Sequence, residues 1–363
     1  MSTEDLRHMR AALELAKAAE GRLSPNPRVG AVLVRDGEVV GRGFHRGPGT
    51  AHAEIEALRE AGERARGATL YVTLEPCRHY GRTPPCTAAL VGAGVSRVIA
   101  AIEDPNPAEQ GKGIAELKAA GIDVTVGLEA EQAEEMNLPY FTWRRTGRPL
   151  VTAKWAAALC GHAAARTGES LYITGSEARR TVHALRAAHD AVLVGIGTVL
   201  QDDPQLTVRD APGEHPLRVV LDGMLRTPPE ARLLSAPGGT LICASEDAPP
   251  ARRQALEERG AELVFFGGGS PLPLGDVLAE LGRRSVLSVL AEGGPKVLGS
   301  LFDAGLVDRV SAFFAPLVLG GAEAPGAVSG LGAARPDEGV RLKDVIWRQL
   351  GQDIYCSGTV ERG

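Results

Sequence analysis

Apolar positions in the N-terminal part of the chain follow first a helical and then a strand period. Between residues 2 and 20, Leu6, Met9 and Leu13 recur at helical spacing behind a Ser-Thr start with acids in the first turn, which predicts an amphipathic helix. Two valine-rich runs then flank Asp36-Gly37, a dipeptide typical of a β-hairpin. Further strand-like runs, separated by helical patterns, lie at 68–74, 95–102 and 122–128. This alternation predicts an α/β layered domain.

The alternation restarts after residues 144–150, a segment that mixes charges, glycine and proline. We interpret this segment as a linker between two α/β domains, at residues 1–146 and 147–363. Helices are expected at 176–188 and 296–304. Strand-like runs lie at 150–155, 190–196, 217–223, 240–245, 261–267, 285–292 and 308–315, followed by an antiparallel hairpin at 345–360.

Composition and charge narrow the class of protein. The length of 363 residues suggests roughly two domains, and 44% hydrophobic with 23% charged residues is ordinary for a soluble enzyme. No apolar run is long enough to span a bilayer, and the acidic N-terminus lacks a signal core, so we expect a cytoplasmic protein with reduced cysteines rather than disulfides. Net charge is -5 and neither half is basic, which favours a small-molecule substrate over nucleic acid or a membrane.

Four residues form a candidate metal centre. His52 and Glu54 stand where a helical pattern begins, and Cys77 follows a strand through a Glu-Pro pair. A helix start with His-x-Glu facing a strand end with Pro-Cys is the arrangement of zinc nucleobase deaminases. With Cys86, one imidazole and two thiolates leave a fourth tetrahedral position for water, unlike a closed structural site. Glu54 is then the expected group for proton transfer to the ring nitrogen and the departing ammonia.

The spacing of the cysteines is unusual, because eight residues separate Cys77 from Cys86 where the usual signature has two. The intervening Arg82 can meet a phosphate, and the proline pair before Cys86 can start a helix that presents its thiolate. Other interpretations stay open: buried cysteines that act as small hydrophobes, His52 as a surface residue, or a structural zinc with four protein ligands.

Four segments around these residues resemble the bifunctional deaminase and reductase family of riboflavin biosynthesis: SPNPRVGAVLVRDGEVVGRGFH, HAEIEAL, YVTLEPCRHYGRTPPC and DPNP. The resemblance implies an α/β fold with an N-terminal cytidine-deaminase-like three-layer domain and a C-terminal dihydrofolate-reductase-like domain. It implies that His52, Cys77 and Cys86 hold Zn2+ while Glu54 moves protons in the deamination of 2,5-diamino-6-ribosylamino-4(3H)-pyrimidinone 5′-phosphate. The implied substrate-holding residues are Asn26, His79 and Arg82. Asn26 alternatively serves only a turn between two prolines.

Residues 176–209 carry much of the likeness to the reductase half of that family, which uses NADPH to reduce the ribosyl side chain to ribityl. The implied substrate contacts are Lys154, Ser170, Arg186, Leu206, Arg209 and Glu292. The residues implied to border NADPH are Ala156, Tyr172, Thr198, Asp202, Gly223, Gly294, Pro295, Lys296, Val297, Leu298, Gly299 and Ser300. The strand, Gly-Gly-Pro turn and helix around Gly294 could receive a dinucleotide phosphate, although such glycines also make turns without a ligand.

The chain departs from the family pattern in the reductase half. Residues 159–162 read LCGH, so Cys160 stands where an aspartate is usual and His162 where an arginine is usual, and Tyr172 replaces a tryptophan. The cysteine removes a carboxylate acceptor, and the spacing of Cys160 and His162 gives no reason to expect side-chain contact. Two interpretations follow: a deaminase with a working reductase, or a deaminase whose second domain only binds substrate or mediates oligomerisation.

A third interpretation is a nucleic-acid base deaminase, which shares the zinc chemistry but requires a basic surface that this chain lacks. A noncatalytic zinc scaffold is the fourth. We expect a homo-oligomer and regard Cys243 and Cys356 as core residues.

Overall fold

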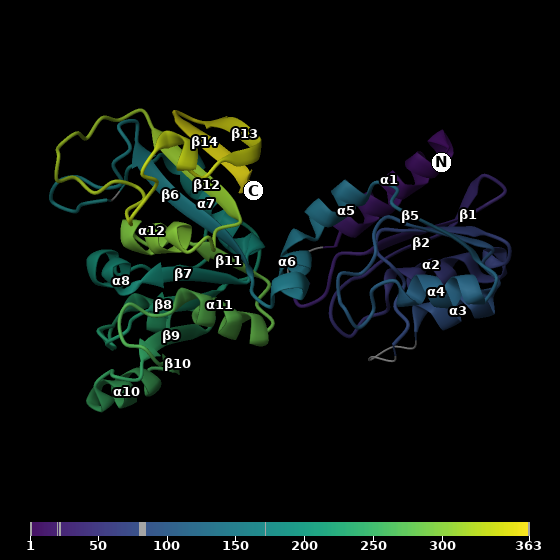
Figure 1. The fold of residues 1–363 in the computed structure, drawn as a ribbon, viewed down its shortest axis with the longest axis horizontal. Helices are drawn as coiled ribbons and strands as arrows, with labels where there is room; N and C mark the ends of the chain where they lie inside the picture. Colours follow the sequence, from purple (N-terminus) through teal and green to yellow (C-terminus); the bar gives the residue numbers. More distant parts are fainter. Residues whose placement is uncertain (1, 20, 22, 80–84, 171, 362–363) are drawn as a thin grey trace. The chain divides into compact units, whose positions relative to one another are not determined.

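The computed structural model describes all residues except 1, 20, 22, 80–84, 171 and 362–363. The chain forms two compact units, Met1–Gly147 and Arg148–Gly363 (Figure 1). The segment interpreted as a linker is shorter than expected, because helix α6 (Leu138–Thr146) includes Arg144 and Arg145 and strand β6 (Leu150–Ala158) begins soon after. Basic residues suit the last turn of a helix, and Gly147 ends it in the left-handed conformation. None of the described helices is long and apolar enough to cross a membrane.

The first unit contains a sheet with the strand order β2-β1-β3-β4-β5. Its strands are β1 (Gly30–Arg35), β2 (Glu38–Phe44), β3 (Thr69–Val72), β4 (Arg97–Ala100) and β5 (Asp123–Val126). Its other helices are α1 (Thr3–Lys17), α2 (Ala53–Ala61), the 3-10 turn η1 (Gly62–Ala65), α3 (Cys86–Ala93), α4 (Lys112–Ala119) and α5 (Ala130–Met136). β1 is antiparallel to both neighbours, and β3, β4 and β5 are parallel.

The alternation of side chains along β1 builds three layers. Ala31 and Leu33 pack with α2, α3 and α4, whereas Val32 and Val34 pack with α1 and α5 on the opposite face. The helices therefore cover both faces of the sheet. The carboxyl end of β3 and the amino ends of α2 and α3 supply the candidate metal ligands.

The second unit contains a larger sheet with the order β10-β9-β8-β7-β11-β6-β12-β14-β13. Besides β6, its strands are β7 (Ala191–Gly195), β8 (Leu217–Leu221), β9 (Thr240–Ser245), β10 (Ala261–Phe266), β11 (Ser288–Ala291), β12 (Arg309–Ala315), β13 (Leu342–Leu350) and β14 (Asp353–Val360). Its helices are α7 (Ser176–Ala188), α8 (Ile196–Asp202), α9 (Arg232–Ser235), α10 (Pro250–Glu257), α11 (Leu274–Arg283), α12 (Pro295–Asp303) and the 3-10 turn η2 (Pro336–Glu338).

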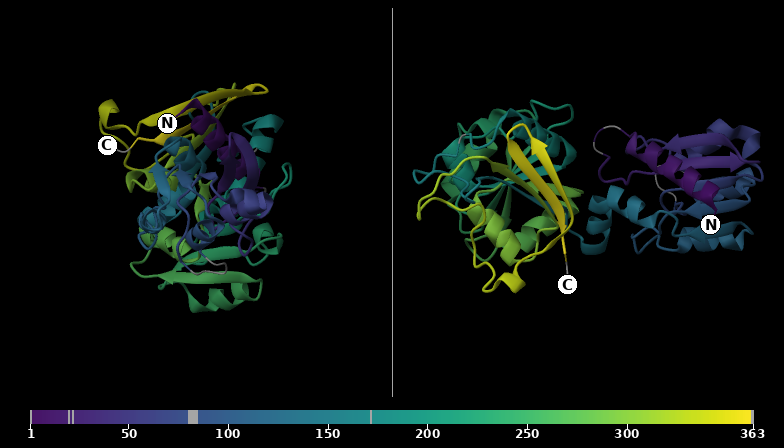
Figure 2. Two further views of the ribbon diagram at one scale, coloured as in Figure 1. Left: turned by 90° about the vertical axis from the view of Figure 1, so that its right-hand side faces the viewer. Right: turned by 90° about the horizontal axis from the view of Figure 1, so that it is seen from above.

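All neighbouring strands from β10 at one edge of this sheet through β9, β8, β7, β11 and β6 to β12 are parallel. The hairpin β13–β14, drawn in yellow in Figure 2, adds two antiparallel strands at the other edge. β7 is buried along its whole length, as expected for a parallel strand covered on both faces. Helices α11 and α12 pack on one face, and α8, α9 and α10 on the other. In open parallel sheets, ligands bind at the carboxyl ends of the central strands, which here are β7, β11 and β6.

Candidate functional site

Three predicted metal ligands come together in the first unit. His52 is the N-cap of α2, Cys86 is the first residue of α3, and Cys77 lies in the loop after β3. Nδ1 of His52 lies 3.3 Å from Sγ of Cys86 and 3.4 Å from Sγ of Cys77. One ligand atom from each residue lies within 4.8 Å of the other two, and the described part of the chain holds no second group of three such side chains.

The electrostatics of this cluster suit a soft divalent cation. The hydrogen bond from Cys86, opposed by burial and assisted by His52, lowers the pKa of Cys77 to about 4. The bond to Cys77, together with burial, raises the pKa of Cys86, and the contact with Cys77 raises the pKa of His52 against the effect of burial. One sulfur is therefore a thiolate at neutral pH beside an imidazole and a second thiol. This is a donor set that Zn2+ prefers.

Glu54 lies in the first turn of α2, two residues after the predicted metal ligand His52. Glu54 is only 3% exposed. Burial, and then the negative charge of Cys77, raises the pKa of Glu54 to about 7. A carboxyl group with a pKa near the working pH is well suited to accept a proton and return it within one reaction.

Asn26 is linked to the same cluster by His45, a buried histidine that the sequence analysis did not identify. Its Nδ2 lies 2.8 Å from Nε2 of His45, whose ring makes an edge contact with His52 at a centroid distance of 5.5 Å. The backbone N–H of Asn26 also donates to the carbonyl of Leu23, so the residue does serve a turn. The turn and the contact with His45 together fix where the amide of Asn26 lies.

Glu109, which the sequence analysis did not identify as a site residue, holds the loop after Cys77. Oε1 of Glu109 lies 3.1 Å from Nδ1 of His79, and Oε2 accepts the backbone N–H of Arg78 at 3.3 Å. Glu109 is only 7% exposed. About thirty positions separate these partners in the chain, so no motif spacing could reveal the contact. Arg82, the third predicted substrate residue, lies outside the described residues.

Glu75 anchors the adjacent DPNP segment in a similar way. Its buried carboxylate accepts the backbone N–H groups of Asp104, Gly111 and Ile114 at 2.9 to 3.1 Å. Because Glu75 lies two residues before Cys77, these bonds join the metal-binding loop to the segment that follows β4.

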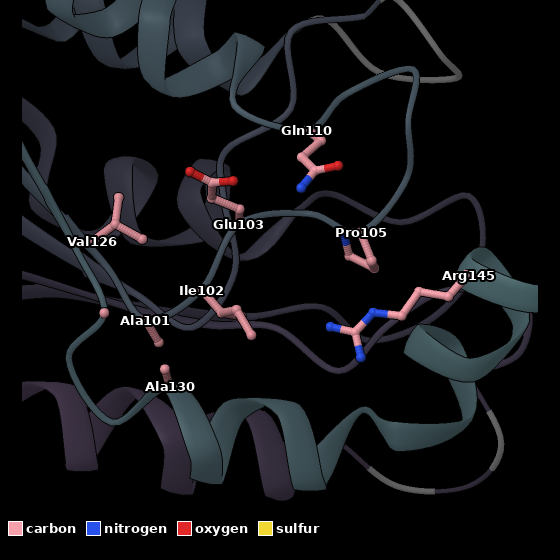
Figure 3. A pocket seen from close by; sticks show the side chains of 9 residues that line it. Ala101, Ile102, Glu103, Pro105, Gln110, Val126, Ala130 and Arg145 are labelled. Carbon is pink, nitrogen blue, oxygen red and sulfur yellow. The ribbon is translucent and has the colours of Figure 1, made fainter. Parts of the chain in front are cut away.

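A hollow of about 360 Å³ lies beside this region, at the ends of β4 and β5. Glu103 and Gln110 face it, and Arg145 of α6 reaches toward Ile102 and Pro105 (Figure 3). None of the residues lining the hollow belongs to the His52–Cys77–Cys86 cluster, so we do not assign the deamination to this hollow.

A buried ion-pair cluster marks the second unit. Glu292 directly follows β11, Arg186 comes from α7 and Lys154 from β6. The guanidinium of Arg186 donates to both carboxylate oxygens of Glu292, at 2.6 and 3.0 Å, and Nζ of Lys154 lies 3.4 Å from Oε2. Burial opposes ionisation of Glu292, but Arg186 and then Lys154 outweigh it and lower the pKa of this carboxyl to about 2. The predicted phosphate contact of Arg186 stays a prediction, since three of its N–H groups already bind Glu292 and the carbonyl of Thr207.

Some of the other predicted reductase residues lie on the helices that follow the central strands β7 and β11, and others have side chains that pack into the core. Oγ of Ser170 donates to Asp202 at 3.3 Å, and a Cβ added to Gly294 would lie 3.7 Å from Oγ1 of Thr198. Gly294 is the N-cap of α12 and has no side chain to occupy the first-turn N–H groups, which suits a dinucleotide phosphate. Pro295 and Lys296 follow in that first turn.

Leu206 and Leu298 are only 3% and 1% exposed and belong to the hydrophobic core. A contact of either with a ligand would therefore come from the backbone, and Leu206 has the left-handed φ of 55°. Gly299 is also buried, because a Cβ there would collide with the carbonyl of Ser329. Val297 packs against Gly293, whereas Ser300 is exposed.

The remaining predicted residues lie nearer the surface or in close backbone contacts. Tyr172 is 73% exposed, with the guanidinium of Arg179 4.7 Å above its ring. Arg209 donates to Thr207 at 2.9 Å. Ala156 lies within β6, and Gly223 approaches Ser270, which a Cβ at position 223 would contact at 3.1 Å.

Known proteins match both units. Residues 149–356 match the RibD C-terminal domain, and residues 2–102 match the cytidine and deoxycytidylate deaminase zinc-binding region. Riboflavin biosynthesis protein RibD of Aquifex aeolicus is 42% identical over 96% of this chain and 97% of its own length. The protein of the same name from Escherichia coli (strain K12) is 40% identical over 97% of this chain and 98% of its own.

The chain belongs to the RibD family.

Solved RibD structures extend the likeness to the whole fold. Form 1 of Acinetobacter baumannii RibD has a TM-score of 0.89 at 39% identity, and 99% of each chain is covered. A structure from Thermotoga maritima has a TM-score of 0.84 at 34% identity, again with 99% of each chain covered. It is described as a diaminohydroxyphosphoribosylaminopyrimidine deaminase/5-amino-6-(5-phosphoribosylamino)uracil reductase.

Membership in the RibD family confirms the predicted fold class, a deaminase-like domain followed by a reductase domain. It also confirms that the chain is an enzyme whose cofactors are zinc and NADPH. The interpretation as a nucleic-acid base deaminase is not favoured, since the RibD likeness covers both units.

Proposed function

We propose that this chain catalyses two steps of riboflavin biosynthesis. The first is the hydrolytic deamination of 2,5-diamino-6-ribosylamino-4(3H)-pyrimidinone 5′-phosphate, and the second is the NADPH-dependent reduction of the ribosyl side chain to ribityl. We assign the deamination to the first unit and the reduction to the second. The observation that carries the proposal is the convergence of His52, Cys77 and Cys86 on one point beside the buried carboxyl of Glu54.

In the deaminase half, His52, Cys77 and Cys86 would hold the zinc through one imidazole and two thiolates. When bound, zinc acts as a Lewis acid that lowers the pKa of water toward about 7. Glu54 takes one proton from the attacking water and passes it to the ring nitrogen, and it then carries the second proton, from the hydroxyl group of the addition product, to the leaving amino group. One C–O bond forms, one C–N bond breaks and ammonia leaves, so Glu54 ends in the protonation state in which it began.

The substrate-holding roles of Asn26, His79 and Arg82 are part of this proposal. His45 holds the amide of Asn26, and Glu109 holds the imidazole of His79 through Nδ1. A carboxylate on Nδ1 fixes the orientation of the ring and leaves Nε2 for a further partner.

In the reductase half, NADPH supplies a hydride to the carbon of the ribosyl group that is at the carbonyl level. Lys154 and Arg186 place two positive charges around Glu292 at the carboxyl end of the central strands. Their charges suit the stabilisation of an oxygen that becomes negative as the hydride arrives. Glu292 keeps both cations in place and remains ionised at neutral pH.

We further propose that the chain is a homo-oligomer that acts in the cytoplasm. All five cysteines are free, which fits a reducing compartment. The edge strand β13 exposes Val345, Ile346 and Trp347, and an exposed apolar edge of this kind is typical of an interface. Trp347→Asp should lower the mass measured by light scattering if β13 pairs with a second copy, and an unchanged mass counts against this interface.

The experiment that tests the function separates the two reactions. The purified chain is incubated with the diaminopyrimidine phosphate, with and without NADPH, while ammonia release and NADPH oxidation are followed independently. We expect ammonia in both samples and stoichiometric NADPH oxidation in the second. Ammonia without NADPH oxidation would support a second unit that only binds substrate, and no ammonia in either sample would contradict the deaminase.

Glu109→Gln is expected to raise the KM of the deamination roughly tenfold with little change in kcat, because a charge-assisted hydrogen bond is worth about 1.5–3 kcal/mol. The amide oxygen of glutamine can still accept the N–H of Arg78, so the loop and the zinc content should persist. The measurement is steady-state ammonia release together with zinc analysis. A KM equal to that of the wild type would show that Glu109 does not position His79 for substrate.

A further inference from the structure

The turn at residues 159–162 brings two reactive side chains together. Sγ of Cys160 lies 3.2 Å from Nδ1 of His162 and accepts the backbone N–H of Leu319 at 3.3 Å. The turn is held by its own backbone, since Ala158 donates to the carbonyl of His162 and Gly161 to that of Ala158, each at 2.8 Å. Gly161 has a φ of 85°, which favours glycine between the two side chains.

This contact changes what the substitution of the family aspartate means. The family pattern places an aspartate and an arginine at the two positions that Cys160 and His162 occupy here. Hydrogen bonds from the backbone of Gly320 and then from His162 lower the pKa of Cys160 to about 6. The sulfur is therefore mostly a thiolate at pH 7, and it accepts the backbone N–H of Leu319. The hydrogen-bond acceptor that the family aspartate would supply is thus replaced by the sulfur of Cys160.

Cys160 also differs from the other four cysteines, all of which the structure describes. Cys160 is exposed, whereas Cys243 and Cys356 are 1% and 5% exposed and burial raises the pKa of each thiol. Cys77 and Cys86 belong to the metal cluster. Reactive cysteines are those that combine thiolate character with access to solvent, and Cys160 alone has both outside the metal cluster.

We propose that Cys160, paired with His162, is a site of reversible thiol–disulfide exchange with low-molecular-weight disulfides of the glutathione class. The thiolate of Cys160 attacks one sulfur of the disulfide, so an Sγ–S bond forms while the S–S bond of the reagent breaks. The departing thiolate takes its proton from solvent. Cys160 is oxidised to the disulfide level and half of the reagent is reduced, so that no further oxidant is needed.

The position of the turn connects this modification to the reductase half. Cys160 follows β6, which carries Lys154, and its partner Leu319 lies in the segment after β12. The same segment reaches α12, where the N–H of Ser329 donates to the carbonyl of Pro295 at 3.0 Å. An adduct on Cys160 therefore lies next to a loop that also contacts the predicted NADPH-binding helix. We expect it to slow NADPH oxidation and to leave ammonia release unchanged.

The test uses the zinc-loaded full chain and two reagents. Oxidised glutathione at pH 7 should add to one cysteine, identified as Cys160 by peptide mass spectrometry, and reducing agent should remove the adduct. In a separate sample without glutathione, iodoacetamide should alkylate Cys160, and the plot of rate against pH should have its midpoint near pH 6. At pH 6 the rate should be roughly tenfold higher than that of an ordinary thiol, once the lower nucleophilicity of a thiolate of low pKa is allowed for.

Two variants distinguish a thiol activated by His162 from the ordinary reactivity of an exposed cysteine. His162→Asn should move the midpoint of the alkylation rate to higher pH, since it removes the side-chain partner. Cys160→Asp, which restores the family carboxylate, should take no adduct and make NADPH oxidation insensitive to oxidised glutathione. A midpoint in the ordinary range of 8 to 9, an adduct on another cysteine, or an unchanged profile in His162→Asn would each overturn the proposal.

Discussion

Glu54→Gln is expected to slow ammonia release by about a hundred- to ten-thousandfold, the usual contribution of a positioned acid and base. Glutamine has the same shape and fits the buried position, but it cannot accept the proton of water and return it to the ring nitrogen. Because Glu54 is not one of the three clustered ligands, the variant should stay folded and keep its zinc. Ammonia release and zinc content measured on the same sample check this expectation.

Glu56→Gln is the matched control. Glu56 lies on the same helix two residues later and pairs with Arg59 near the surface, so its loss should leave ammonia release within about twofold of the wild type. NADPH oxidation with the deaminated intermediate should be normal in both variants. If Glu54→Gln still released ammonia at the rate of Glu56→Gln, the proton-transfer role of Glu54 would be wrong.

Glu292→Gln is expected to lower the stability of the second unit by about 3–5 kcal/mol, the usual cost of breaking a buried ion pair from one side. The side chains of Arg186 and Lys154 are only 12% and 15% exposed, so their charges would remain buried without the carboxylate. NADPH oxidation should be lost, while ammonia release persists. Urea unfolding and the two activity assays measure these effects.

The pH dependence of stability gives an independent signature of the same carboxylate. The pKa of Glu292 is about 2 in the folded chain against an ordinary value of 4.5, so its charged form is favoured by folding. Its contribution is fully present above pH 4.5 and disappears as the pH falls through about 2, a difference of about 3 kcal/mol. Glu292→Gln should lack this acid-induced loss.

Glu262→Gln is the control variant, because it removes one carboxylate from an exposed ion pair instead of a buried one. Glu262 pairs with Arg284, but its side chain is 59% exposed, and such pairs contribute less than about 1 kcal/mol. A wild-type stability in Glu292→Gln, or an equal loss in Glu262→Gln, would contradict the importance of the buried cluster.

The sequence predicts the fold well where one local pattern determines an element. β7 is a continuous apolar run bounded by turns, and α7 occupies the expected residues 176–188 because an amphipathic pattern there is uninterrupted. The metal residues could be predicted for a similar reason, since a helix start and a strand end carry them in recognisable order. The linker is shorter than the predicted segment 144–150, because Arg144 and Arg145 suit the last turn of a helix rather than a loop.

Contacts between distant segments could not be predicted from spacing. Glu292, Arg186 and Lys154 come from three elements, and the charge of each alone resembles an ordinary surface residue. The bond between Glu109 and His79 depends on how two loops meet at the edge of the sheet. The pairing of Cys160 with His162 depends on a tight turn around Gly161, which sequence separation does not determine.

Zinc content and ammonia release, measured together on the wild type and on Cys86→Ser, test the metal centre most directly. We expect one zinc ion per wild-type chain, and we expect the variant to lose both the metal and the release of ammonia while it still oxidises NADPH with the deaminated intermediate. A folded chain that contains no zinc and deaminates at the full rate would contradict the assignment of His52, Cys77 and Cys86 to a catalytic metal.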